Sequence, residues 1–226
     1  MVTETSPPAS SAIEDYAKAI HSLQSRDGKE VSNNALAARL GVSPAAASGM
    51  TKRLTHLGLV RHRPYHGVRL TKKGEQVALQ VIRHHRLLEL YLAESLGVPW
   101  DRVHDEAEVL EHVLSEDLEE RIAEQLGDPT RDPHGDPIPT RDGRIDEVPG
   151  PAMYDLEPGA RGTFVRVSDS DPEMLRYLSE RGIAPGTTFE VEDRQPFDGP
   201  LFVRFGSAVH ALGSPLARAM WVEVSA

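Results

Sequence analysis

The chain contains no cysteine. That absence excludes disulfide bonds, thiolate zinc sites and thiol nucleophiles, so any bound metal must be held by His, Asp, Glu, backbone carbonyls or water. A chain without cysteine is also compatible with the reducing cytoplasm, which is where we expect this protein to reside.

Long apolar runs are missing as well. No stretch reaches the roughly 18 residues that a membrane span requires, so no membrane partner is expected. The first 11 residues are polar and lack the basic and apolar regions of a signal peptide, which indicates a short disordered tail. With 226 residues, 39% hydrophobic and 27% charged, the chain can form one large or two modest soluble domains.

The common catalytic motifs are also absent. There is no His-Glu-x-x-His, Gly-x-Ser-x-Gly, P-loop or Gly-x-Gly-x-x-Gly pattern, and Glu111-His112 continues as Val-Leu-Ser-Glu. We therefore expect a protein that is not an enzyme and has no small-molecule substrate. A hydrolase built on the carboxylates is a minor alternative.

The net charge of −10 is unevenly distributed along the chain. Residues 39–86 contain ten Lys and Arg and a single acid, Glu75, whereas residues 101–124 contain ten acids and two Arg. The basic first third could meet phosphates, and the acidic middle could hold cations.

The first third has the pattern of a winged helix-turn-helix. Residues 11–26 are amphipathic and predict a helix, and residues 33–40 predict a short second helix after the possible cap Ser32. Ser43-Pro44 starts a third helix that ends near Leu57. Two short basic strands then follow around a turn, at 59–63 and 68–71, as in a wing.

The outer face of the third helix is small or basic, which permits close approach to a major groove. A helix that only fills a core is the alternative, and it does not account for this face. We expect DNA contacts from the second and third helices and the wing: Asn33, Ser43, Pro44, Ala45, Ala46, Ser48, Gly49, Lys52, Arg53 and His66.

The remaining chain predicts a dimerisation layer and a small β domain. Long helices at 72–96 and 100–126 suggest a homodimer, because two recognition helices on a palindromic double-stranded operator require a twofold axis. A Pro-, Gly- and Asp-rich stretch follows, and then five short strands suggest an SH3-like β-barrel. The expected fold is α+β, with a winged-helix domain at 1–73, a helical domain at 74–140, a linker at 141–157 and the barrel at 158–226.

Imidazoles and carboxylates recur at helical spacing in the middle of the chain. His85 and Glu89 stand at i, i+4, and the helix expected over 100–126 carries four further such residues on one face: His104, Glu108, Glu111 and His112. These residues form either a solvated, salt-bridged surface, in which Arg86 could serve as a surface charge, or a divalent-metal site. Without a cation, the glutamates would repel one another.

Three motifs together resemble the diphtheria toxin repressor family of metal-dependent transcriptional regulators. They are His85-Arg-Leu-Leu-Glu89, Val103-His-Asp-Glu-Ala-x-x-x-Glu-His112 and Asp132-Pro-His-Gly-Asp-Pro-Ile-Pro139. The resemblance covers nearly the whole chain and implies a winged helix, dimerisation helices and an SH3-like domain.

Iron-responsive members of this family carry Met and Cys at two ligand positions where this chain has Asp15 and Glu108, as manganese-responsive members do. The resemblance therefore implies a primary site of Asp15, Glu108, Glu111 and His112 with His85 adjacent, and carboxylates in place of sulfur suit Mn²⁺. Lys18 stands where short manganese regulators often have an acid, so their two-metal cluster is not expected.

The resemblance also implies a second site from Glu89, His104, Asp132 and His134, with Asp169, Asp171 or Glu173. The implied function is a Mn²⁺-activated dimeric repressor of manganese homeostasis genes, in which the metal orders the DNA-binding domains. Fe²⁺ is the alternative cofactor in an iron-dependent repressor, and other divalent metals are expected to bind in vitro. A winged-helix protein whose acidic helices bind only a protein partner is the third possibility.

Overall fold

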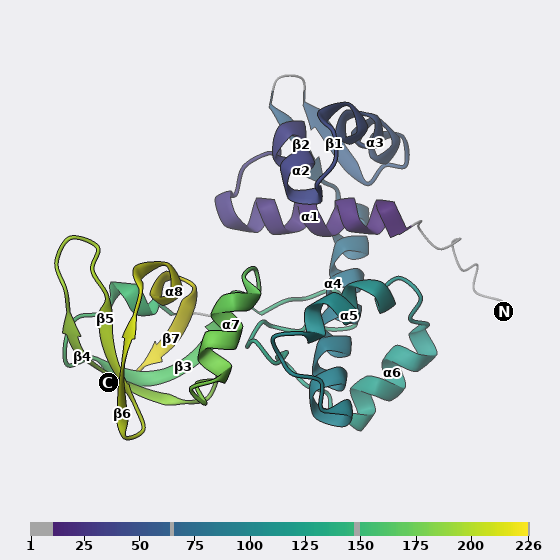
Figure 1. The fold of residues 1–226 in the computed structure, drawn as a ribbon. Coiled ribbons are helices and arrows are strands. Elements are labelled where there is room, and N and C mark those ends of the chain that lie inside the picture. The colour runs from purple at the N-terminus through teal and green to yellow at the C-terminus, as the bar shows by residue number, and fades with distance from the viewer. Residues whose placement is uncertain (1–10, 64–65, 147–149, 226) are drawn as a thin grey trace. The chain divides into compact units, whose positions relative to one another are not determined.

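The computed structural model describes residues 11–63, 66–146 and 150–225 (Figure 1). The N-terminal tail and the wing residues Pro64-Tyr65 lie outside the described residues. The chain forms two compact units: one holds the described residues up to 84 together with 139–144, and the other holds 85–138 and the described residues from 145 onward. In the described residues, no helix has the length and apolar character needed to cross a bilayer.

The first unit contains the predicted winged helix-turn-helix. Its elements are α1 (Ser11–Asp27), α2 (Asn33–Leu40), α3 (Pro44–His56), β1 (Val60–Arg63) and β2 (Gly67–Leu70). Ser32 and Ser43 cap α2 and α3 by accepting hydrogen bonds from backbone N–H groups, as their positions predict. The wing strands are antiparallel, and Gly67 has a φ of 123°, with the Val31 carbonyl where a Cβ would lie.

Helix α4 (Lys72–Leu96) has the predicted bounds, but the predicted helix over 100–126 is wrong. It is two helices, α5 (Val103–Leu110) and α6 (Glu116–Gln125), separated by a turn. Ser115 explains the break, because its hydroxyl accepts from the Leu118 N–H and its backbone is extended, so it starts a new helix. Glu111 and His112 therefore lie just after α5 rather than within a continuous helix.

The C-terminal part is a β domain with one five-stranded antiparallel sheet in the order β6-β5-β4-β3-β7. The elements are the 3-10 turn η1 (Met153–Asp155), β3 (Arg161–Val167), α7 (Pro172–Ser179), β4 (Thr188–Arg194), β5 (Leu201–Phe205), β6 (Ala208–Leu212), α8 (Ser214–Arg218) and β7 (Met220–Val224). All five strands were predicted, and alternating buried residues of these strands fill the core.

Part of the expected linker belongs to this core. Met153, Tyr154 and Leu156 are buried in the β domain, and Ala152 forms a bridge with Trp221. The Pro- and Gly-rich composition of this stretch concealed these apolar anchors. The domain limits given above otherwise remain predictions.

Candidate metal centre

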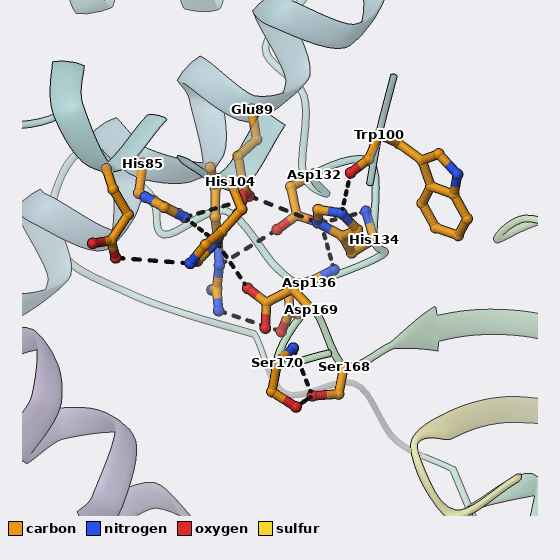
Figure 2. Close-up of polar contacts among 12 residues, drawn as sticks. His85, Glu89, Trp100, His104, Asp132, His134, Asp136, Ser168, Asp169 and Ser170 are labelled. Atoms are coloured by element: carbon orange, nitrogen blue, oxygen red, sulfur yellow. Dashed lines mark hydrogen bonds and ion pairs between the residues drawn. The ribbon is translucent and has the colours of Figure 1, made fainter. Parts of the chain in front are cut away.

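Glu89 of α4 is the centre of a buried polar cluster. Its Oε1 lies 3.0 Å from His85 Nε2 and 3.2 Å from His104 Nδ1, and the two ring nitrogens are 3.1 Å apart. Asp169, after β3, places Oδ2 3.5 Å from His104 Nδ1. Figure 2 shows Glu89 with His85 and His104 on one side and with Asp132 and His134 on the other.

The other Glu89 oxygen faces the loop that follows α6. Glu89, Asp132 and His134 each offer one ligand atom, and these atoms lie within 4.8 Å of one another, as do those of His85, Glu89, His104 and Asp169. Asp132 shapes the loop through its Oδ1, which accepts from the N–H groups of His134 and Asp136, both at 2.9 Å. The other oxygen of this carboxylate, Asp132 Oδ2, takes no part in these two backbone hydrogen bonds.

A backbone carbonyl fixes the orientation of the His134 ring. Its Nε2 lies 2.8 Å from the Trp100 carbonyl oxygen, and because a carbonyl only accepts, Nε2 carries the hydrogen. The opposite nitrogen, Nδ1, is buried without a hydrogen-bond partner and lies 3.8 Å from Glu89 Oε2. A carbonyl that accepts from one ring nitrogen and a second, buried ring nitrogen that faces carboxylates are typical of a metal-ligating histidine, so these residues fit a divalent cation.

The cluster also perturbs its own proton equilibria. Burial opposes ionisation of Glu89, but contacts with His104, His134 and His85 outweigh it and hold the pKa of this carboxyl well below its usual range. Burial and the charges of Glu89 and Asp136 raise the pKa of Asp132 to about 8. Burial lowers the pKa of His134, but Glu89 and Asp132 outweigh it and raise that pKa to about 9.

His85 connects this cluster to a second one. Its Nδ1 lies 2.5 Å from Glu111 Oε2, while Glu111 Oε1 lies 3.5 Å from His112 Nε2. His85, Glu108 and Glu111 together offer ligand atoms within 4.8 Å of one another. Asp15 is half-buried on α1 of the first unit, and its role with these residues stays a prediction.

Of the three acids expected from the β domain, Asp169 is the one that approaches His104. Asp171 is engaged elsewhere, because its Oδ1 accepts from the Glu173 N–H as the N-cap of α7. The Glu173 side chain is exposed.

Sequence reasoning missed three charged neighbours of this loop. Arg86 does not act as a surface charge: its side chain is 19% exposed, and its Nη1 donates to the Pro137 carbonyl. Arg86 and Arg166 both contact Asp136, at 3.3 Å and 2.9 Å. Asp136, the second aspartate of the Asp132-Pro-His-Gly-Asp136 motif, was the sequence signal available for these contacts. Its partners Arg86 and Arg166 lie far from it in the sequence.

The candidate DNA-binding residues gather on α3 and the wing of the first unit. Exposed along α3 are Pro44, Ala45, Ala46, Gly49, Lys52 and Arg53, and Ser48 is half-buried. Ser43 is the N-cap of α3, Asn33 accepts from the Thr51 hydroxyl at 2.9 Å, and His66 is exposed on the wing. This face is small and cationic, as major-groove contact requires.

Three family models match the chain in succession. They are described as the N-terminal DNA binding domain of iron dependent repressors, at residues 9–68, the metal binding and dimerisation domain of the same repressors, at 71–140, and the FeoA domain, at 152–224. The iron-dependent repressor IdeR of Mycobacterium tuberculosis is 32% identical, covering 93% of this chain and 96% of its own. The diphtheria toxin repressor of Corynebacterium efficiens is also 32% identical, covering 93% and 94%.

Solved structures agree with these sequence relationships. A manganese-dependent transcriptional repressor in complex with manganese is 44% identical, with a TM-score of 0.86 over 94% of this chain and 100% of its own. The manganese regulator SloR is 30% identical, with a TM-score of 0.75 over 94% and 98%. The chain therefore belongs to the diphtheria toxin repressor family and is a metal-dependent transcriptional repressor.

Proposed function

We propose that this protein is a Mn²⁺-activated repressor of manganese homeostasis genes, with the metal as corepressor. The observation that carries the proposal is the chemistry of the candidate ligand groups, which consist of imidazoles and carboxylates in a chain without cysteine. Oxygen and nitrogen donors suit Mn²⁺, whereas sulfur donors favour softer ions. The names of the similar manganese-dependent transcriptional repressor and of the manganese regulator SloR support the same metal.

Two ligand sets belong to the proposal. The primary set is Asp15, Glu108, Glu111 and His112, with His85 adjacent. The second set is Glu89, His104, Asp132, His134 and Asp169, and the proposal leaves out Asp171 because that carboxylate caps α7. A bound divalent cation would place positive charge beside Glu89, Glu111 and Asp132. Without the metal, nearby cationic side chains supply the positive charge that faces these carboxyl groups.

The proposed target is a palindromic double-stranded operator in the cytoplasm. A homodimer would present two copies of α3, each with the exposed face from Pro44 to Arg53. Wing residues such as His66 would contact the phosphate backbone.

Iron is the competing metal, because one of the relatives described above is named an iron-dependent repressor. In a manganese-dependent repressor, Mn²⁺ raises DNA affinity at a concentration at which Fe²⁺ has no effect. In an iron-dependent repressor, the reverse holds. Mn²⁺ binds a given site more weakly than Fe²⁺ in the general order of affinities, so both titrations need buffered free metal.

The test is fluorescence anisotropy with a duplex selected from random sequence by the metal-loaded protein. We expect buffered Mn²⁺ to raise affinity at least about tenfold over chelator, and Glu111→Gln or Asp15→Ala to lose that gain. The control Asp142→Asn, at an exposed turn, should retain it. Equal binding with chelator and Mn²⁺ would overturn the corepressor role, and activation only by anaerobic Fe²⁺ would replace manganese with iron.

A further inference from the structure

Arg86 lies against the Asp132 to Pro137 loop beside the proposed second ligand set. Its Nε lies 3.6 Å from Asp132 Oδ2, its Nη2 lies 3.3 Å from Asp136 Oδ1, and its Nη1 donates to the Pro137 carbonyl at 2.5 Å. The guanidinium therefore stands next to the one Asp132 oxygen that the backbone does not engage. An arginine keeps its positive charge at any working pH.

Other bonds also hold the loop in shape. Asp132 Oδ1 accepts two backbone N–H groups, Arg131 Nη1 donates to the Gly135 carbonyl at 2.9 Å, and the Val167 N–H donates to the His134 carbonyl at 2.9 Å. Asp136 has a second cation, since Arg166 Nε lies 2.9 Å from its Oδ1. Arg86 adds to these contacts a positive charge that does not titrate, beside Asp132 Oδ2.

We infer that Arg86 is a built-in counter-cation that sets, and weakens, divalent-metal affinity at Glu89, Asp132 and His134. This inference rests on the proposed function, because it requires a cation at those residues. In the metal-free protein, the guanidinium offsets the repulsion among the buried carboxylates. When the metal binds, the same fixed charge repels it in a poorly screened interior, so the site fills only at a higher metal concentration than its ligands alone would require.

The loss of the Arg86 charge should have two effects of opposite sign. Removing the charge should destabilise the metal-free protein and at the same time tighten metal binding. A residue that only positioned ligands would do the opposite to affinity, because its loss would disorder the site. The signs of the two effects therefore separate the two roles.

The experiment uses the full chain with Trp221→Phe, which leaves Trp100 as the only tryptophan. Trp100 stacks on His134 with ring centroids 5.6 Å apart, so its fluorescence reports on this site. In buffered Mn²⁺ titrations, we expect Arg86→Gln to lower the midpoint at least about tenfold, with a lower metal-free melting temperature. Arg86→Lys keeps the charge and should stay within about threefold of the parent.

A weaker or unchanged midpoint in Arg86→Gln would overturn the inference. If Arg86→Gln folds only with Mn²⁺, the titration is repeated for both proteins in an osmolyte that folds the metal-free variant, and a midpoint above that of the parent would also overturn the inference. His134→Ala keeps the two proposals apart. It should abolish the Trp100 response and remove the manganese bound at this second ligand set only. If it does neither, the ligand assignment fails, whereas an Arg86 failure beside an intact His134 effect affects Arg86 alone.

Discussion

Asp132 and His134 make the metal-free protein pH-sensitive in the same direction. The pKa of Asp132 rises from 3.8 to about 8, and that of His134 rises from 6.5 to about 9. A group whose folded-state pKa is raised stabilises the fold below its unfolded pKa, and this contribution is lost as pH rises through the folded value. Both groups therefore reduce the stability of the metal-free protein as pH increases towards 9.

We predict that the melting temperature of the chelated protein falls steadily from pH 5 to pH 9. Asp132→Asn should flatten this slope, because an asparagine Oδ1 can still accept the His134 and Asp136 N–H bonds while the charge is gone. Differential scanning calorimetry across this range measures the effect. A parent protein whose stability rises with pH would contradict the prediction.

Gly135 sets how closely the Asp132 to Pro137 loop approaches β3. It has a φ of 86°, and a Cβ there would lie 2.0 Å from the Val165 carbonyl oxygen. We predict that Gly135→Ala lowers the free energy of unfolding by about 2–4 kcal/mol in urea denaturation, because strain and a backbone clash combine.

Gly159→Ala is a matched control for this prediction. Gly159 has a φ of 90° with nothing within 4 Å of its Cβ position, so it isolates the conformational cost, about 1 kcal/mol. Equal losses in both variants would show that the approach to β3 does not matter.

Most of the clustered residues could be found from sequence spacing and family motifs. The i, i+4 pair His85 and Glu89 lies on one helix face whatever the rest of the chain does. The choice of Asp169 over Asp171 was missed, although Asp171-Pro172 is a helix-cap signal of the same kind as Ser43-Pro44. The partners of Arg86 depend on a loop about 50 residues away in sequence.

At the level of elements, Ser115 decides that the acidic region is two helices. We predict that Ser115→Ala reduces the free energy of unfolding by about 1 kcal/mol, since α6 loses the side chain that accepts the Leu118 N–H. Ser115→Asp retains a capping oxygen and should match the parent in thermal denaturation. Equal stability of all three proteins would leave the break between α5 and α6 unexplained by the cap.

Cap signals explain why most element boundaries were predictable. Ser32, Ser43 and the Pro after Ser43 mark helix starts by local hydrogen bonding, which the sequence displays directly. The apolar periodicity of residues 103–114 concealed the break before Ser115, because a turn preserves that periodicity over a few residues. The burial of Met153 and Tyr154 depends on the distant strand β7 and has no local signal.

For the whole molecule, the exposed apolar residues of α5 and the turn after it are the important feature. Val109 is 72% exposed and Val113 is 76% exposed, and Leu110 and Leu118 are partly exposed nearby in sequence. These residues lie within the segment matched by the metal binding and dimerisation domain. We expect a second copy of the chain to cover these side chains, because the matched domain is described as a dimerisation domain.

We predict that Val109→Glu with Val113→Glu raises the dimer dissociation constant at least about 100-fold, because two buried charges would replace apolar contacts at the interface. Sedimentation velocity measures this shift. Val209→Glu is the control: Val209 is also exposed, but it lies on β6 in the FeoA-like domain, so this variant should remain dimeric. A monomeric Val209→Glu beside a dimeric double variant would move the interface to the β domain.

If the prediction holds, operator affinity should fall in the double variant even with saturating Mn²⁺, because a single recognition helix reads only half of a palindrome.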